Sequence, residues 1–99
     1  MAKLTTKNWR NKNGTKDRNC KCGSWKQHWI NFSRKPWPSS CSVLGCKQPA
    51  EIGAHVYNPE VSGEKIVPMC KLCNKLDTPF SLKNETRVVS ANKSETCER

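Results

Sequence analysis

The sequence predicts a small α+β domain that relies on its cysteines as much as on its apolar core. Three observations lead to this prediction. The chain has only 99 residues, hydrophobic residues make up 34% of it, and seven of its residues are cysteine. A short chain with few apolar side chains buries too little surface to offset the entropy lost on folding, so such domains commonly need a cross-link or a bound metal ion. The helix and the strands follow from local patterns along the chain.

Basic residues are concentrated in the first part of the chain. The whole sequence has 18 Lys and Arg against eight Asp and Glu, a net charge of +10. Residues 1–40 contain ten of the basic residues, all four tryptophans and a single acid, Asp17. A basic surface with interleaved aromatic residues is typical of nucleic-acid-binding proteins, so we expect DNA or RNA as a partner. The alternative is that the charge only keeps a small protein in solution.

The chain is expected to consist of a flexible arm and one domain. Residues 1–19 are polar and basic and lack apolar periodicity, which predicts a basic flexible arm. Residues 20–99 contain all seven cysteines and are expected to form a single domain. No apolar run approaches the roughly 18 residues of a membrane span, and no apolar stretch follows the basic N-terminus as in a secretory signal. We therefore expect a cytoplasmic protein with no membrane partner.

A short amphipathic helix is expected over residues 25–34. Ser24 and Gln27 have the spacing of a capping box at a helix start. Three aromatic residues then recur with the period of a helix: Trp25, Trp29 and Phe32. Prolines 36 and 38 follow and end the segment. The aromatic face is expected to pack on the domain, and a platform for stacking bases is the alternative.

A β-hairpin is expected in the middle of the chain. Residues 51–57 and 64–68 have the composition of strands, and the turn residues Asn58-Pro59 and Ser62-Gly63 lie between them. Antiparallel pairing of these strands would place the residues on both sides of the hairpin close together in space.

Two further elements are expected after the hairpin. A short helix begins near Met69, and Pro79 limits it to about two turns. Residues 86–91 include two consecutive valines and predict one more strand.

Four cysteines have the spacing of a zinc site. Four residues separate the first pair, two separate the second, and the hairpin between them can bring the pairs together: Cys41, Cys46, Cys70 and Cys73. Zn²⁺ prefers four such ligands in a tetrahedron, and in a reducing compartment dense cysteines indicate metal binding before disulfides. We therefore expect residues 20–99 to be a zinc-binding domain. The alternative is two disulfides or inert thiols.

The remaining cysteines allow a second zinc site. Cys20, Cys22 and Cys97, with one histidine, would complete a second set of four ligands. We favour His55 as that ligand, because the small residues before it allow close approach, and His28 is the alternative. Otherwise these three cysteines are free thiols.

The order of these residues is similar to that in the HNH endonuclease-like treble-clef family. The shared pattern is a cysteine pair, then Ala54-His55-Val56 on a strand, then Ile66-Val67-Pro68-Met69 before the second cysteine pair. It covers residues 41–75. The resemblance implies a small zinc-stabilised treble-clef-like domain, made of a knuckle, a β-hairpin and a short helix. The basic N-terminal arm and the amphipathic helix are additions to that pattern.

The resemblance assigns roles to individual residues. His55 matches the general base by position. Ala54 stands where the family has an acidic metal ligand, and Lys65 stands where it has a supporting Asn. Asn74 replaces the last histidine ligand. A divalent metal that hydrolyses a phosphodiester needs charged oxygen or imidazole ligands and an open position for water, so this pattern favours a retained scaffold without the chemistry.

These observations predict a small zinc protein that binds nucleic acid on a degenerate HNH-like scaffold, and they favour binding over catalysis. One alternative is a protein-interaction adaptor that presents the aromatic helix face to a protein partner. The other is a metal-dependent nuclease with His55 as the base, in which Glu51 or Glu60 supplies the missing carboxylate.

Overall fold

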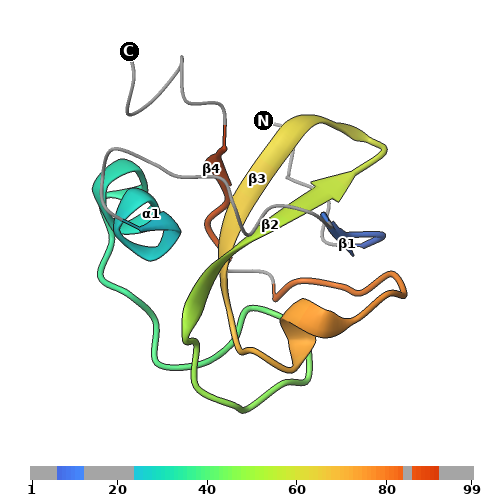
Figure 1. The fold of residues 1–99 in the computed structure, drawn as a ribbon, viewed down its shortest axis with the longest axis horizontal. Helices are drawn as coiled ribbons and strands as arrows, with labels where there is room; N and C mark the ends of the chain where they lie inside the picture. The colour runs from blue at the N-terminus through green and yellow to red at the C-terminus, as the bar shows by residue number, and fades with distance from the viewer. Residues whose placement is uncertain (1–6, 13–23, 84–85, 92–99) are drawn as a thin grey trace.

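The fold is a four-stranded antiparallel sheet with one α-helix on it, which confirms the α+β prediction (Figure 1). The computed structural model describes residues 7–12, 24–83 and 86–91. Its elements in chain order are β1 (Arg10–Asn11), α1 (Trp25–Ser33), β2 (Ile52–Asn58), β3 (Val61–Met69), the 3₁₀ helix η1 (Cys73–Lys75) and β4 (Val89–Ser90). The strands lie in the order β1-β2-β3-β4. Within these residues, no helix is both long enough and apolar enough to cross a lipid bilayer.

Strands β2 and β3 form the predicted hairpin. Their register pairs Ile52 with Met69 and His55 with Ile66. The turn is tighter than expected, because β3 already begins at Val61. The Asn58 side-chain oxygen accepts a 2.9 Å hydrogen bond from the backbone N–H of Glu60, which closes the turn.

Gly63 lies inside β3 rather than in the turn, contrary to the sequence expectation. Its φ is +79°, a left-handed conformation that glycine adopts without steric cost. The pairing of β2 with β3 shifts register between Val56 and Asn58, close to this glycine. An irregularity of this kind lets an extended hairpin absorb the extra residues that the sequence predicts to lie in a loop.

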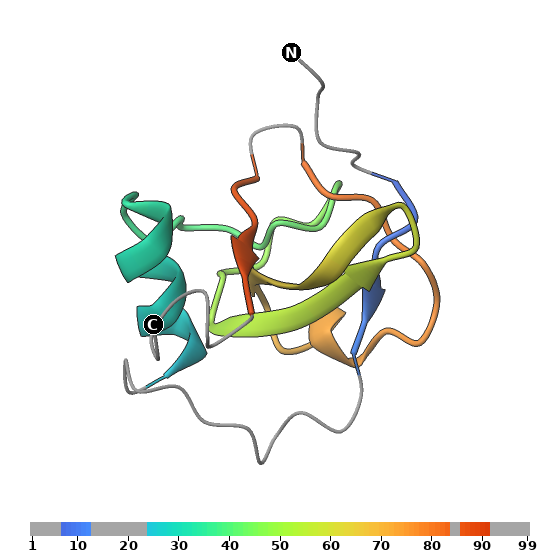
Figure 2. The same ribbon diagram turned by 90° about the horizontal axis from the view of Figure 1, so that it is seen from above.

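The alternation of side chains along the hairpin builds two cores. Ala54 and Val56 of β2 contribute to the larger core on one face of the sheet, whereas His55 between them contacts α1 on the other. On β3, Val67 belongs to the larger core and Ile66 to the smaller one under the helix. Figure 2 shows α1 on one side of the hairpin and η1 on the other. The sheet therefore separates the helix from the cysteine-rich side.

Helix α1 begins and ends where its sequence predicts, to within one residue. The Ser24 hydroxyl accepts a 3.0 Å hydrogen bond from the Gln27 backbone N–H and caps the helix. The Gln27 side chain bonds Asn31 instead, so the capping-box spacing is present but its reciprocal bond is not. Arg34, with φ +59°, ends the helix.

The prediction of a flexible arm over residues 1–19 is wrong for residues 7–12. Trp9 is fully buried in the larger core, and its backbone exchanges hydrogen bonds of 3.0 and 2.8 Å with Phe80. The following residues, Arg10 and Asn11, form β1 on the edge of β2. Burial of one large aromatic side chain, together with these backbone bonds, holds a segment whose composition is otherwise polar. Residues 1–6 and 13–19 lie outside the described part.

The short helix expected after Met69 is also shorter than predicted. Only the single 3₁₀ turn Cys73–Lys75 forms, and Leu76 is already extended with ψ 133°. Asn11 accounts for the difference, because its side-chain amide donates to the carbonyl oxygens of Cys73 and Leu76. The predicted strand at residues 86–91 is present as β4, which pairs with β3.

Candidate metal centre

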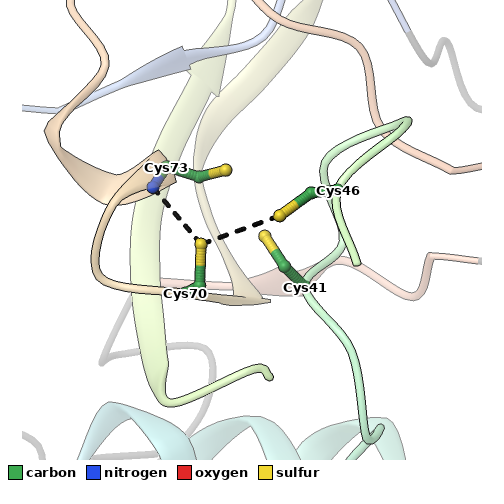
Figure 3. A group of neighbouring side chains, drawn as sticks. All are labelled: Cys41, Cys46, Cys70 and Cys73. Carbon is green, nitrogen blue, oxygen red and sulfur yellow. Dashed lines mark hydrogen bonds between the residues drawn. The ribbon is translucent and has the colours of Figure 1, made fainter. Parts of the chain in front are cut away.

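Four thiols converge on the cysteine-rich side of the sheet, as Figure 3 shows. The sulfur atoms of Cys41, Cys46, Cys70 and Cys73 all lie within 4.8 Å of one another. The Cys46 and Cys70 sulfurs are 3.8 Å apart. A tetrahedral zinc ion with Zn–S bonds of about 2.3 Å requires sulfur–sulfur separations of about 3.8 Å. The prediction that these four cysteines meet is confirmed, and the cluster can hold one metal ion.

The first pair lies on a tight turn before β2. Gly45 has φ +85°, and the N–H of Cys46 donates a 3.0 Å bond back to the Val43 carbonyl. This turn points both thiols the same way, whereas an L-residue at position 45 would be strained. Cys41 is fully buried and belongs to the larger core, so the site is continuous with that core.

The second pair directly follows β3. The backbone N–H of Cys73 donates to the Cys70 sulfur at 3.4 Å, and the N–H of Asn74 donates to the Cys70 carbonyl at 3.1 Å. Such N–H···S bonds stabilise negative charge on a sulfur ligand. The end of β3 thus delivers one pair of thiols, and the turn before β2 delivers the other.

Three side chains from distant parts of the chain hold the two turns. Asn11 bonds the turn that follows Cys73, as described above. A carboxylate oxygen of Glu51 accepts from the Lys71 N–H at 3.3 Å. The Lys83 ammonium donates to the Cys46 carbonyl at 2.9 Å and to the Ser40 hydroxyl at 3.3 Å. No local sequence signal marks Asn11 or Lys83, because each lies more than 30 residues from the turn it supports.

The thiols differ in their readiness to ionise. Burial raises the pKa of Cys41 above its ordinary value. Burial also raises the pKa of Cys73, and contacts with the other three thiols raise it further. Burial acts in the same direction on Cys70, but hydrogen bonds from Cys73 and from the neighbouring thiols leave its pKa lowered. A dication among the four favours the thiolate form of every one, and four sulfur ligands complete a tetrahedron without a place for water.

The two histidines lie on the helix side of the sheet, away from the described cysteines. His55 is 5% exposed and its ring lies 4.3 Å from the ring of Trp25, edge to face. His28 is fully buried, its Nε2 donates a 2.8 Å bond to the Ser90 carbonyl, and burial lowers its pKa. The cysteines of the expected second site lie outside the described residues: Cys20, Cys22 and Cys97. That site therefore stays a prediction.

The residues to which the HNH resemblance assigns catalytic or metal-binding roles lie in different environments. Ala54 lies in the larger core, and Lys65 pairs across the hairpin with Val56 rather than with His55. Of the two acids considered as replacements for the missing ligand, Glu51 accepts a hydrogen bond from the Lys71 N–H. Glu60 lies in the hairpin turn. Among the described residues, the group of side chains placed to hold a metal ion is the cysteine cluster, which does not include His55.

The aromatic face of α1 is mostly covered. Trp29 is 3% exposed, and its indole N–H donates a 2.8 Å bond to the Arg87 carbonyl. Trp25 is half-buried against His55. Phe32 is 41% exposed. The expectation that this face packs on the domain is confirmed for the two tryptophans.

Comparisons of the chain with protein-family models, with curated proteins and with solved structures found no match. The resemblance to HNH endonuclease-like treble-clef proteins therefore rests on the motifs of residues 41–75. The order of a cysteine turn, a hairpin and a second cysteine turn agrees with that resemblance. The 3₁₀ turn at Cys73–Lys75, in place of the α-helix, does not.

Proposed function

We propose that this chain is a structural zinc protein that binds nucleic acid through its basic surface. The observation that carries the zinc assignment is the meeting of four cysteine sulfurs within 4.8 Å. Thiolates are the ligands that Zn²⁺ takes in closed structural sites, and such sites contribute directly to folding. In this proposal the ion joins the two cysteine turns to the larger core on a treble-clef-like scaffold.

The distribution of exposed charge supports nucleic acid as the partner. Among the described residues, only three carboxylic acids are exposed: Glu51, Glu60 and Asp77. Ten exposed basic residues oppose them: Lys7, Arg10, Lys12, Lys26, Arg34, Lys35, Lys47, Lys71, Lys75 and Arg87. Cations on so many elements attract a polyanion, and each neutralised phosphate releases counterions on binding.

Metal analysis tests the first half of the proposal. We expect one zinc ion bound by the described cysteines, measured by native mass spectrometry and elemental analysis, and a second if the predicted site of Cys20, Cys22 and Cys97 forms. Replacement of these three by Ser would then lower the count from two to one, whereas Cys41→Ser removes the ion of the described cluster. Removal of zinc with a chelator should abolish the folded circular-dichroism spectrum. A metal-free chain with the same spectrum contradicts the proposal.

A binding titration tests the second half of the proposal, the binding of nucleic acid. Binding of labelled DNA and RNA oligonucleotides, followed by fluorescence anisotropy, should weaken steeply as the salt concentration rises. The slope of the logarithm of the binding constant against the logarithm of the salt concentration should be roughly −0.7 to −0.9 per phosphate contact. Absence of binding at low salt removes the nucleic-acid assignment and leaves the zinc assignment intact.

A further inference from the structure

A cavity of about 520 Å³ lies between the end of α1, the first cysteine turn and the segment that precedes β4. Its volume is within the range of small-molecule sites in proteins. The residues around it come from distant parts of the chain, within 29–42, at 68, and at 83, 86 and 87, so the tertiary fold creates it. Cys41 contributes to its wall, which places the cavity directly beside the metal centre.

The polar groups around the cavity suit an anion. Three cations line it: Lys35, Lys83 and Arg87. Three hydroxyl side chains line it as well: Ser40, Ser42 and Thr86. The described lining residues include no carboxylic acid. Ammonium, guanidinium and hydroxyl groups are the donors that bind phosphate oxygens.

The apolar part of the wall suits a flat ring. It is made of Pro36, Pro38 and Pro68 with the edge of Trp29. Trp29 is held in place by its bond to the Arg87 carbonyl and by an edge-to-face contact with Trp37 at 5.5 Å. A rigid apolar wall beside phosphate-binding cations matches a nucleotide, which joins an aromatic base to a phosphate.

Lys83 is already positioned by the fold. Its ammonium bonds the Cys46 carbonyl and the Ser40 hydroxyl, so its charge is fixed at the boundary between the cavity and the first cysteine turn. A fixed cation loses little conformational entropy when an anion binds. Lys35 and Arg87 are exposed at the rim and can close on the ligand.

We propose that this cavity binds one nucleotide unit, with the phosphate at Lys35, Lys83 and Arg87 and the base against the prolines. The inference rests on the proposed nucleic-acid binding and narrows it to unstacked nucleotides. A duplex keeps its bases paired and stacked, whereas a single strand can insert one base. A free nucleotide and a unit within a strand share this chemistry, and the test separates them.

The test compares two variants with the same change in charge. The cavity variant is Lys35→Glu/Arg87→Glu, which leaves Lys83 and its contact with the cysteine turn intact. The control is Arg10→Glu/Lys12→Glu, two exposed cations on and beside β1 that do not line the cavity. The probes are AMP, inorganic phosphate, a labelled single-stranded oligonucleotide and its duplex. Zinc content and circular dichroism establish that both variants fold.

We expect the cavity variant to bind AMP and the single strand at least about ten-fold more weakly than the control does, because it loses two charge-assisted contacts. The single strand should bind more tightly than the duplex, and AMP more tightly than phosphate. For the single strand, the slope of the logarithm of the binding constant against the logarithm of the salt concentration should be about 1.4 smaller in magnitude in the cavity variant than in the wild type. Each of the two lost phosphate contacts contributes about 0.7 to this slope.

Other results overturn the inference in distinguishable ways. Equal losses of affinity in both variants show a general charge effect. An unchanged affinity in both variants shows that the probes bind a different surface. Both of these reject the cavity and leave nucleic-acid binding in place. Binding of AMP without binding of oligonucleotides rejects the proposed function and retains the cavity as a site for free nucleotides. Failure of the wild-type protein to bind any probe rejects both.

Discussion

The side-chain amide of Asn11 donates a 2.9 Å hydrogen bond to the backbone carbonyl of Cys73 and a second of the same length to Leu76. Asn11 lies in β1, next to the buried Trp9, whereas Cys73 supplies the fourth thiol of the metal centre. A short N-terminal strand therefore determines the path of the chain around the metal ligands. If the four cysteines hold the proposed ion, Asn11 belongs to its second coordination sphere.

Replacement of Asn11 by Ala should destabilise the fold and speed the release of zinc. Two carbonyls would each lose one hydrogen bond, while the Leu76 N–H still donates to the Cys73 carbonyl. Two such bonds together contribute about 1–3 kcal/mol to the free energy of unfolding. Urea unfolding and transfer of zinc to a chromophoric chelator measure the two effects. Asn58→Ala is the control, because Asn58 is also buried and also bonds the backbone, at Lys7 and Glu60, away from the thiols. Equal rates of zinc release in the two variants would contradict the assigned role.

Gly53→Ala should be among the most damaging substitutions in the sheet. A Cβ at this position would lie 2.5 Å from the carbonyl carbon and 2.6 Å from the carbonyl oxygen of Trp25. These are backbone atoms, so α1 would have to move away, at a cost of about 3 kcal/mol or more. Gly45→Ala is the comparison, because it meets no atom within 4 Å and suffers only from its positive φ, about 1–2 kcal/mol. Thermal and urea unfolding should rank the two in that order, and the reverse order would exclude the close approach of helix and strand.

Lys83→Met should weaken zinc binding without removing a ligand. The change deletes the bonds to the Cys46 carbonyl and the Ser40 hydroxyl and removes a positive charge at the first cysteine turn. Loss of such an outer contact typically lowers metal affinity 10–100-fold. Competition with a chelator of known affinity gives the measurement. Lys75→Met, at an exposed lysine in η1, removes the same charge without a described bond to a cysteine turn and should change the affinity much less.

Stability should fall as the pH decreases below about 6.5, in part because of His28. Burial holds the pKa of His28 below the ordinary value of 6.5, so the unfolded chain binds the proton more readily than the folded protein does. The contribution of neutral His28 to the free energy of unfolding is complete above pH 6.5, and it is lost as the pH falls through the lowered pKa of His28. His28→Gln keeps an N–H donor for the Ser90 carbonyl and cannot titrate. Unfolding midpoints at about pH 7.5 and about pH 5.5 should therefore differ less in this variant, and an unchanged difference would show that other groups cause the pH dependence.

Features set by short-range spacing were predictable from the sequence. The cap at Ser24, the helix period of its aromatic residues and the strands on either side of Asn58 each depend on neighbours within a few positions. The four ligands of the metal centre were predictable for a different reason. Few residue types serve as zinc ligands, so the cysteine pairs at 41/46 and 70/73 are each other's most direct partners in one site.

Features set by long-range contacts were not predictable. The composition around Trp9 favours an arm, and contacts with distant residues, including Phe80 71 residues later, make it a core segment. Likewise, the residues after Cys73 resemble a helix start, and Asn11 ends that helix after one 3₁₀ turn. The cavity beside the first cysteine turn combines three segments, none of which has a nucleotide-binding motif.

The exchange of backbone hydrogen bonds between Trp9 and Phe80 has a consequence for biosynthesis. Ribosomes add roughly 5–20 residues per second, so the tryptophan waits at least several seconds before its partner has been translated. During that interval a large indole is exposed on an incomplete chain, where chaperones and other nascent chains can reach it. The larger core can therefore be completed only after Phe80 has been translated.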